Sequence, residues 1–258
     1  TRDRLRAAGF HRPALVDDSL DWNLVELRHQ EFNLLFGGQL SLALLPRPDD
    51  RALVQAFDRY RDNDFAGVLE LWPTQYRAPS GHIQQLVLAR CYAELARPEC
   101  LELIMEAEKR YPIDAAAVRA IYQWRAGKTA DAAQSLERFY TLLADSPWVL
   151  PVVSETATSR TIDVAKADHD AARRLNTSLS RPFASWRFDY LRTLARFMVA
   201  EQLSPESVVE ALRELEPNVP WTAEVLEARA KAYAAVEHPL AARAKNDWLW
   251  FQRHRSAE

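Results

Sequence analysis

Residues of similar kind recur along this sequence every 32 positions, and this internal repetition restricts the possible folds more than any other feature. A shift of 32 superposes Tyr60, Tyr92 and Trp124. The other columns that stay apolar or small are Ala56, Leu88 and Ala120; Phe57, Ala89 and Ile121; Val68, Cys100 and Ala132; and Trp72, Ile104 and Leu136. Repeats of this length are typical of stacked supersecondary units, so the sequence predicts an array of such units.

Each repeat has the pattern of two antiparallel helices. In the first repeat, Leu53, Ala56, Phe57 and Tyr60 share one helical face and form an apolar stripe. Turns are expected at 62–63, 95–98 and 126–128, where Gly127 can end a helix in the left-handed conformation. The small residue that opens each second helix allows the two helices to cross closely.

These repeats resemble the tetratricopeptide-repeat (TPR) family. The third repeat carries the family's pattern best, through Ala120, Trp124, Gly127, Ala132 and Leu136. The second repeat contributes Leu88, Ala89, Tyr92, Cys100, Ile104, Ala107 and Pro112. The first departs from the pattern, with Asn63 at the turn glycine and Val68 at the small residue, and the period is shorter than the family's 34 residues. The resemblance implies an all-α, right-handed superhelical solenoid of antiparallel helix pairs, whose first helices line a concave wall.

Four segments are expected along the chain. Residues 1–48 form an N-terminal segment and linker, with a helix over 20–36 and a short strand over 39–44. The three repeats occupy 49–147, degenerate helical repeats with one helix over 162–178 occupy 148–221, and a fourth helix pair occupies 222–258. The fourth pair is expected because residues 232–241 parallel residues 91–100, with tyrosine, proline and a small residue at identical spacing.

Composition excludes several classes of function. The six glycines form neither a dinucleotide-binding fingerprint nor a phosphate-binding loop. The balance of 33 basic and 36 acidic residues argues against a nucleic-acid binder, and no apolar run is long enough to cross a membrane. Cys91 and Cys100 are expected to be buried thiols in a reducing, cytoplasmic setting. Because the chain begins with Thr1, we expect it to be a piece of a longer protein.

Neither a catalytic nor a metal-binding constellation is evident in the sequence. The only local cluster of hard ligands is Asp163, Asp168, His169 and Asp170, and consecutive helical residues point about 100° apart, so the last three cannot converge on one ion. A helix start or a solvated helix face is the better interpretation. We therefore predict a chain without cofactor, metal or catalytic residues of its own.

The TPR resemblance instead implies a protein-protein interaction scaffold that holds a peptide or partner segment. The first-helix residues expected to face its groove are Asp58, Arg61, Arg90, Tyr122 and Arg125. Three arginines and a tyrosine suit an acidic or carboxylate-bearing segment. Near the end of the chain, Trp248 and Trp250 point to opposite sides of one helix, so one of them is expected to be exposed and able to anchor a partner.

An alternative is an accessory domain of a larger enzyme. Asp17-Asp18, the run from Asn23 to Glu26, and the pairing of Trp22 with Arg28 are similar to the junction in fused spermidine-synthase-like (polyamine aminopropyltransferase) proteins, where helical repeats follow a catalytic domain. On this hypothesis the repeats would position the catalytic domain or its oligomer.

Overall fold

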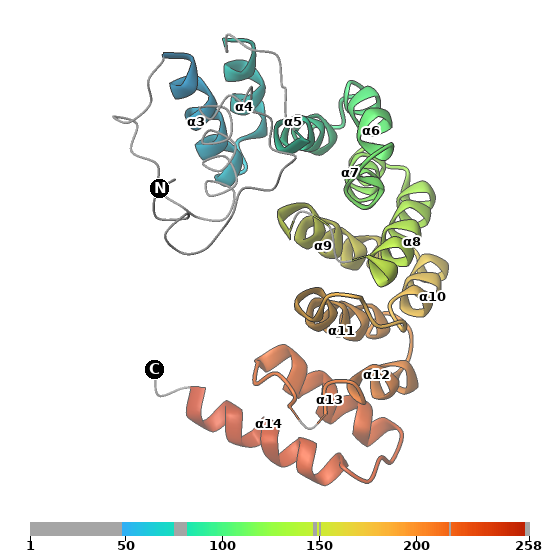
Figure 1. The fold of residues 1–258 in the computed structure, drawn as a ribbon. Helices are drawn as coiled ribbons and strands as arrows, with labels where there is room; N and C mark the ends of the chain where they lie inside the picture. Colours follow the sequence, from blue (N-terminus) through green and yellow to red (C-terminus); the bar gives the residue numbers. More distant parts are fainter. Residues whose placement is uncertain (1–47, 75–81, 147–148, 150, 217, 256–258) are drawn as a thin grey trace, which may run out of the picture. The chain divides into compact units, whose positions relative to one another are not determined.

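The computed structural model describes residues 48–74, 82–146, 149, 151–216 and 218–255, and these residues form helices and no strand (Figure 1). The predicted all-α class is therefore confirmed for this part of the chain. The helix expected over 20–36 and the strand expected over 39–44 lie outside the described residues. The chain divides into two compact units, unit 1 (residues 1–83) and unit 2 (residues 84–258), a division that falls inside the predicted segment 49–147.

Unit 1 is built around aromatic side chains. Its elements are α3 (Pro48–Arg61), α4 (Phe65–Leu71) and the short 3-10 helix η2 (Trp72–Thr74). The rings of Phe57 and Trp72 meet edge to face with their centroids 6.4 Å apart. Tyr60 meets Phe65 in the same way at 6.1 Å. The apolar stripe predicted for the first helix therefore packs against both elements that follow it.

Unit 2 contains ten helices among the described residues. They are α5 (His82–Glu94, which begins two residues before the unit), α6 (Cys100–Glu108), α7 (Pro112–Arg125), α8 (Thr129–Asp145), α9 (Pro151–Ala167), α10 (His169–Ser178), α11 (Trp186–Ala200), α12 (Pro205–Leu212), α13 (Ala223–Ala235) and α14 (Ala241–Arg255). None of the described helices is both long enough and apolar enough to cross a bilayer.

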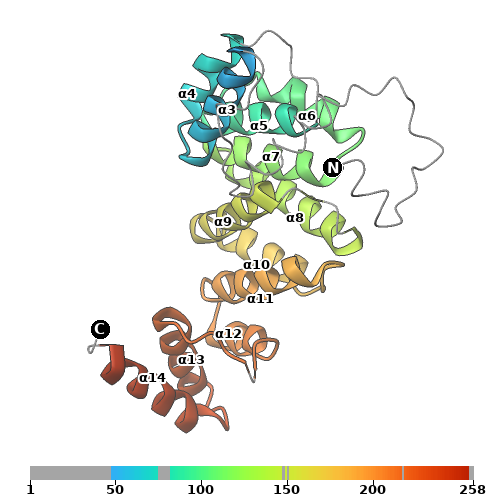
Figure 2. The ribbon, with the colours of Figure 1, turned by 60° about the vertical axis from the view of Figure 1, so that its left-hand side comes forward.

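The helices of unit 2 pack in consecutive pairs. α7 packs against α8, α9 against α10, α11 against α12 and α13 against α14. Neighbouring pairs also meet, because α9 contacts both α7 and α11, and α10 contacts α8 (Figures 1 and 2). Side chains from α5 to α11 form one apolar core, and side chains from α11 to α14 form a second. α11 therefore joins the two cores.

Four helix pairs close with the same backbone turn. The residues in the left-handed conformation, with φ between 53° and 74°, are Asn63, Ala96, Gly127 and Glu237. The N–H that follows each of them donates to a carbonyl five residues earlier, as from Lys128 to Gln123 (2.8 Å) and from His238 to Tyr233 (2.9 Å). This is the Schellman motif, and it satisfies carbonyls at the helix end. The predicted role of Gly127 is confirmed, and the parallel between 91–100 and 232–241 extends to the backbone.

The columns of the repeat are mostly buried, as their composition predicts. Val68, Cys100 and Ala132, which share one column of the repeat, are fully buried, and so are Ile104 and Leu136. The aromatic column is less uniform, because Tyr60 is buried whereas Tyr92 and Trp124 keep part of their surface exposed. The first helices of the second and third repeats thus leave aromatic surface accessible.

The helix predicted over 162–178 is wrong, because two helices occupy this region. α9 ends at Ala167 and α10 begins at His169. Asp168 separates them in an extended conformation, and its carboxylate accepts hydrogen bonds from the backbone N–H groups of Asp170 (2.9 Å) and Ala171 (3.0 Å). Satisfying these N–H groups is the function of an N-cap residue, so Asp168 marks a helix start.

The shared turn can be tested with a pair of substitutions. Gly127→Ala is expected to lower the free energy of unfolding by about 1 kcal/mol, because a Cβ is strained at positive φ although no atom lies within 4 Å of its place. Ala96→Gly at the corresponding turn is expected to raise it by about 0.5–1 kcal/mol. Urea unfolding measures both changes, and shifts in the same direction would contradict a common turn.

Candidate functional site

The predicted groove residues of unit 1 are Asp58 and Arg61. They lie on α3, one turn apart, and their side chains form an ion pair at the protein surface. The other three predicted residues, Arg90, Tyr122 and Arg125, belong to unit 2. The five predicted residues therefore fall into two groups, one in each unit.

In unit 2 the predicted arginines are engaged within the protein. Arg90 on α5 is only 5% exposed. Arg125 on α7 donates a hydrogen bond to the carboxylate of Glu94 on α5, with 2.7 Å between Nε and Oε2. Tyr122 packs partly against the apolar core. These arginines therefore serve contacts inside the chain, and Tyr122 is the predicted residue of unit 2 that offers apolar surface.

Glu94 connects three helices through its two arginine partners. Its side chain is 2% exposed, and it also lies 3.3 Å from the guanidinium of Arg160 on α9. Arg160 in turn pairs with Asp163, one turn further along α9, at 2.9 Å. A buried carboxylate is tolerated when cations and hydrogen bonds surround it, so this cluster fixes α5, α7 and α9 relative to one another.

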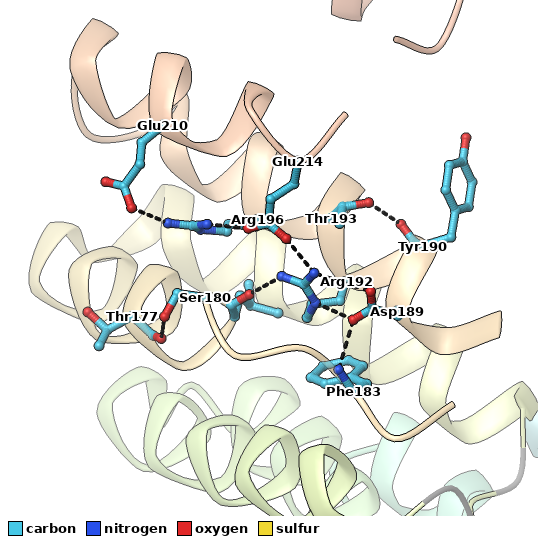
Figure 3. A network of polar contacts seen from close by, with 11 residues as sticks. Thr177, Ser180, Phe183, Asp189, Tyr190, Arg192, Thr193, Arg196, Glu210 and Glu214 are labelled. Atoms are coloured by element: carbon cyan, nitrogen blue, oxygen red, sulfur yellow. Dashed lines mark hydrogen bonds and ion pairs between the residues drawn. The ribbon is translucent and has the colours of Figure 1, made fainter. Parts of the chain in front are cut away.

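A larger network of this kind links α10, α11 and α12 (Figure 3). The side chain of Arg192 on α11 is 2% exposed, and its guanidinium donates to the Leu179 carbonyl (2.7 Å) and to the carboxylate of Asp189 (2.6 Å). It also pairs with Glu214, which follows α12. All three guanidinium nitrogens of Arg192 therefore donate to oxygen acceptors, which come from three segments of the chain.

Arg196 extends the network by one turn of α11. It pairs with Glu214 and, at 2.6 Å, with Glu210 of α12. Burial opposes ionisation of Glu214, but the hydrogen bonds from Arg192 and Arg196 outweigh burial and hold the pKa of this carboxyl below its usual value. The pKa of Asp189 is lowered in the same way, with burial opposed by Arg192 and by the Phe183 N–H.

A further buried arginine joins the last two helices. Arg229 on α13 is 2% exposed and donates to Glu216 (2.7 Å) and to Asp247 of α14 (2.8 Å). Its guanidinium lies over the ring of Tyr233, 5.3 Å from the centroid. Arg192, Arg196 and Arg229 have a structural explanation, because each one meets carboxylates of the chain itself.

The described residues contain no cluster of histidine, cysteine, aspartate or glutamate that could hold a metal ion. Both cysteines are buried, and burial raises the pKa of Cys91 to about 12 and that of Cys100 to about 11. A thiol with such a pKa stays protonated at neutral pH and is a poor nucleophile or metal ligand. The cysteines are therefore core residues, as the sequence predicts.

The surface feature best suited to binding is an exposed aromatic cluster at the last helix pair, formed by Trp221, which precedes α13, and by Trp250 and His254 of α14. Trp221 is 49% exposed and Trp250 is 52% exposed. Their ring centroids lie 5.8 Å apart, and His254 stacks on Trp250 at 4.0 Å. Trp248, by contrast, is only partly exposed and stacks with Phe251. The prediction that one of Trp248 and Trp250 is exposed is confirmed, whereas the contact with Trp221 has no signal in the sequence.

A second exposed apolar feature lies on α11. Tyr190 and Met198 are 52% and 38% exposed, and Leu194 lies between them at intervals of four residues. Residues spaced by four share one face of a helix. In Figure 3 the ring of Tyr190 points away from the arginine network. α11 therefore buries Arg192 and Arg196 and exposes Tyr190 and Met198 on another face.

Comparisons with protein-family models, with curated proteins and with solved structures found no match for the chain. The resemblances to TPR proteins and to spermidine-synthase-like fusions thus remain hypotheses that rest on residue patterns.

The arginine network leads to a prediction about acid stability. At pH 7, Glu214→Gln is expected to lower the free energy of unfolding by about 1.5–3 kcal/mol, the usual contribution of a hydrogen bond to a charged group. Because the folded pKa of Glu214 lies below its unfolded value of about 4.3, this contribution is present above that value and is lost as the pH falls through the folded pKa. The difference between the variant and the wild type should therefore shrink as the pH falls below about 4.3.

Glu210→Gln is the matched control. Its side chain is 59% exposed and pairs only with Arg196 among the described residues, so its effect should stay below about 1 kcal/mol. Chemical unfolding at several pH values measures all three proteins. A Glu214→Gln deficit that is as large at pH 3 as at pH 7 would show that ionisation of Glu214 is not its source.

Proposed function

We propose that this chain is a non-catalytic protein-protein interaction scaffold, a TPR-like right-handed solenoid of helical hairpins that binds a segment of a partner protein. Two observations support the architecture. The helix pairs of unit 2 contact their neighbours in sequence order, and pairs in both units share one turn. Stacked hairpins present extended surfaces, and proteins built in this way use such surfaces for binding.

The observation that carries the proposal is the aromatic cluster. Two tryptophans that touch each other and are each about half exposed leave a large apolar area in water. Large exposed apolar side chains that gather in one place mark interaction sites, and tryptophan is enriched among the residues that dominate binding energy. Arg253, which is exposed, lies three residues from Trp250 and supplies a polar edge.

The contacts of the predicted arginines change the kind of partner segment that we expect the first helices to bind. Arg61 and Arg125 already pair with carboxylates of the chain, and Arg90 is buried. The accessible side chains on the first helices of unit 2 include Tyr122, Tyr190 and Met198. We therefore propose that the partner segment meets apolar contacts on these helices, and that the predicted arginines stabilise the scaffold.

Site-specific crosslinking in cells of the source organism tests the proposal. A photoreactive phenylalanine analogue at position 250 is expected to capture a defined partner, because this side chain is half exposed. Trp221→Ala should reduce capture by tenfold or more, since the loss of one anchor residue typically costs about 2 kcal/mol of binding free energy. Thermal unfolding should change little, because the surface of Trp221 is half exposed.

The control places the same photoreactive group at Lys128, which is exposed in the turn between α7 and α8. Equal crosslinking of the partner from positions 128 and 250 would contradict the proposal that the aromatic cluster binds it. Crosslinking from position 250 that is unchanged in Trp221→Ala would contradict it as well.

A further inference from the structure

A separate groove opens between α13 and α14, with a volume of about 440 Å³. Its lining residues are Glu227, Ala230, Lys231, Ala234, Ala241, Ala242, Lys245 and Trp248. On α13, the interval of four residues between Ala230 and Ala234 places both on one face, and the buried residues Arg229 and Tyr233 lie on the adjacent face. Ala230 and Ala241 also pack partly against the second apolar core. The groove therefore lies at the edge of that core, and its exposed lining residues are Lys231, Ala234, Ala242 and Lys245.

The alanines of the groove make it suited to a helix. A helix backbone can approach another closely only where the side chains between them are small, and this chain uses alanine in that way. Ala116 and Ala120 of α7 and Ala132 and Ala133 of α8 are all buried in the core that these two packed helices share. In the groove, by contrast, Ala234 and Ala242 are exposed.

The charged residues at the groove are two lysines and one glutamate, and they come from both helices. Lys231 on α13 is 74% exposed and pairs with Glu227 on its own helix. Lys245 on α14 is exposed and forms no ion pair with any residue that the structure describes. Elsewhere in the chain, neighbouring helices match such cations with carboxylates: Arg138 of α8 meets Glu108 of α6, and Arg174 of α10 meets Glu137 of α8, each at 2.7 Å. By the same complementarity, an occupant of the groove would supply the carboxylates.

We propose that this groove binds a helix of a partner protein that presents small residues to the alanines and carboxylates to Lys231 and Lys245. The alanines of the groove favour a partner helix with small side chains, and the two lysines favour a partner with negative charge. This site goes beyond the aromatic cluster, because none of its lining residues belongs to that cluster. Trp221→Ala therefore tests the proposed function, and changes at the groove test this inference.

A library of displayed helical hairpins with randomised outer surfaces provides the probe, and the full chain is the target. Hairpins selected on the wild type are expected to carry alanine, glycine or serine flanked by aspartate or glutamate. Lys231→Glu/Lys245→Glu should weaken their binding at least tenfold, and added salt should weaken it in the wild type. Ala234→Arg should abolish binding by filling the groove.

Lys128→Glu/Lys166→Glu is the matched control, because it reverses two exposed lysines that do not line the groove. It should leave binding within about twofold, because neither lysine is among the lining residues that would contact an occupant of the groove. Circular dichroism verifies that each variant is folded.

Three results would overturn the inference. The selected hairpins could be as rich in lysine and arginine as in acidic residues. Alternatively, no selected hairpin would be displaced by Ala234→Arg. Finally, sedimentation of the chain alone could reveal a dimer that Ala234→Arg dissociates, which would assign the groove to a second copy of the chain.

Discussion

Arginine side chains that end on carboxylates of other helices determine how the helix pairs of unit 2 fit together. Arg192 and Arg229 are almost completely buried, and removing a guanidinium from water costs several kcal/mol unless acceptors replace the water. A stack in which helices slid past one another would separate these cations from their carboxylates. Alanine-rich surfaces alone would tolerate such sliding more readily. We infer that apolar burial drives the pairs together and that the arginines select one register.

The sequence predicts the repeated elements of this fold because their signals are local. The turn at Gly127 needs only a residue that tolerates positive φ, and burial of the repeat columns follows from helical periodicity. Residues 151–161 were not predicted as helix because serine, threonine and valine dominate them, and these are weak helix formers. Packing of Val153 and Ala157 in the core supplies what local propensity lacks.

The candidate site was less predictable because it depends on contacts between residues far apart in the chain. Charge and helical face made Arg125 a candidate for binding a partner, yet its carboxylate partner lies 31 residues earlier. Nothing near Arg125 in the sequence identifies Glu94 as that partner. Trp250 was easier to place, because residues two apart on a helix point to different sides. Its contact with Trp221, 29 residues away, requires the fold.

The ion pair between Arg229 and Asp247 has a consequence for the motion of the last helix. Asp247 is the acceptor that α14 offers to this buried cation, while Glu216 precedes α13. When α14 fluctuates away from α13, the guanidinium loses one of these two carboxylates. Local opening of α14 therefore costs free energy, because the buried guanidinium of Arg229 on α13 loses the Asp247 carboxylate. This cost adds to that of the lost apolar contacts and opposes the opening of α14. α14 is thereby held in place by a charge buried in the preceding helix.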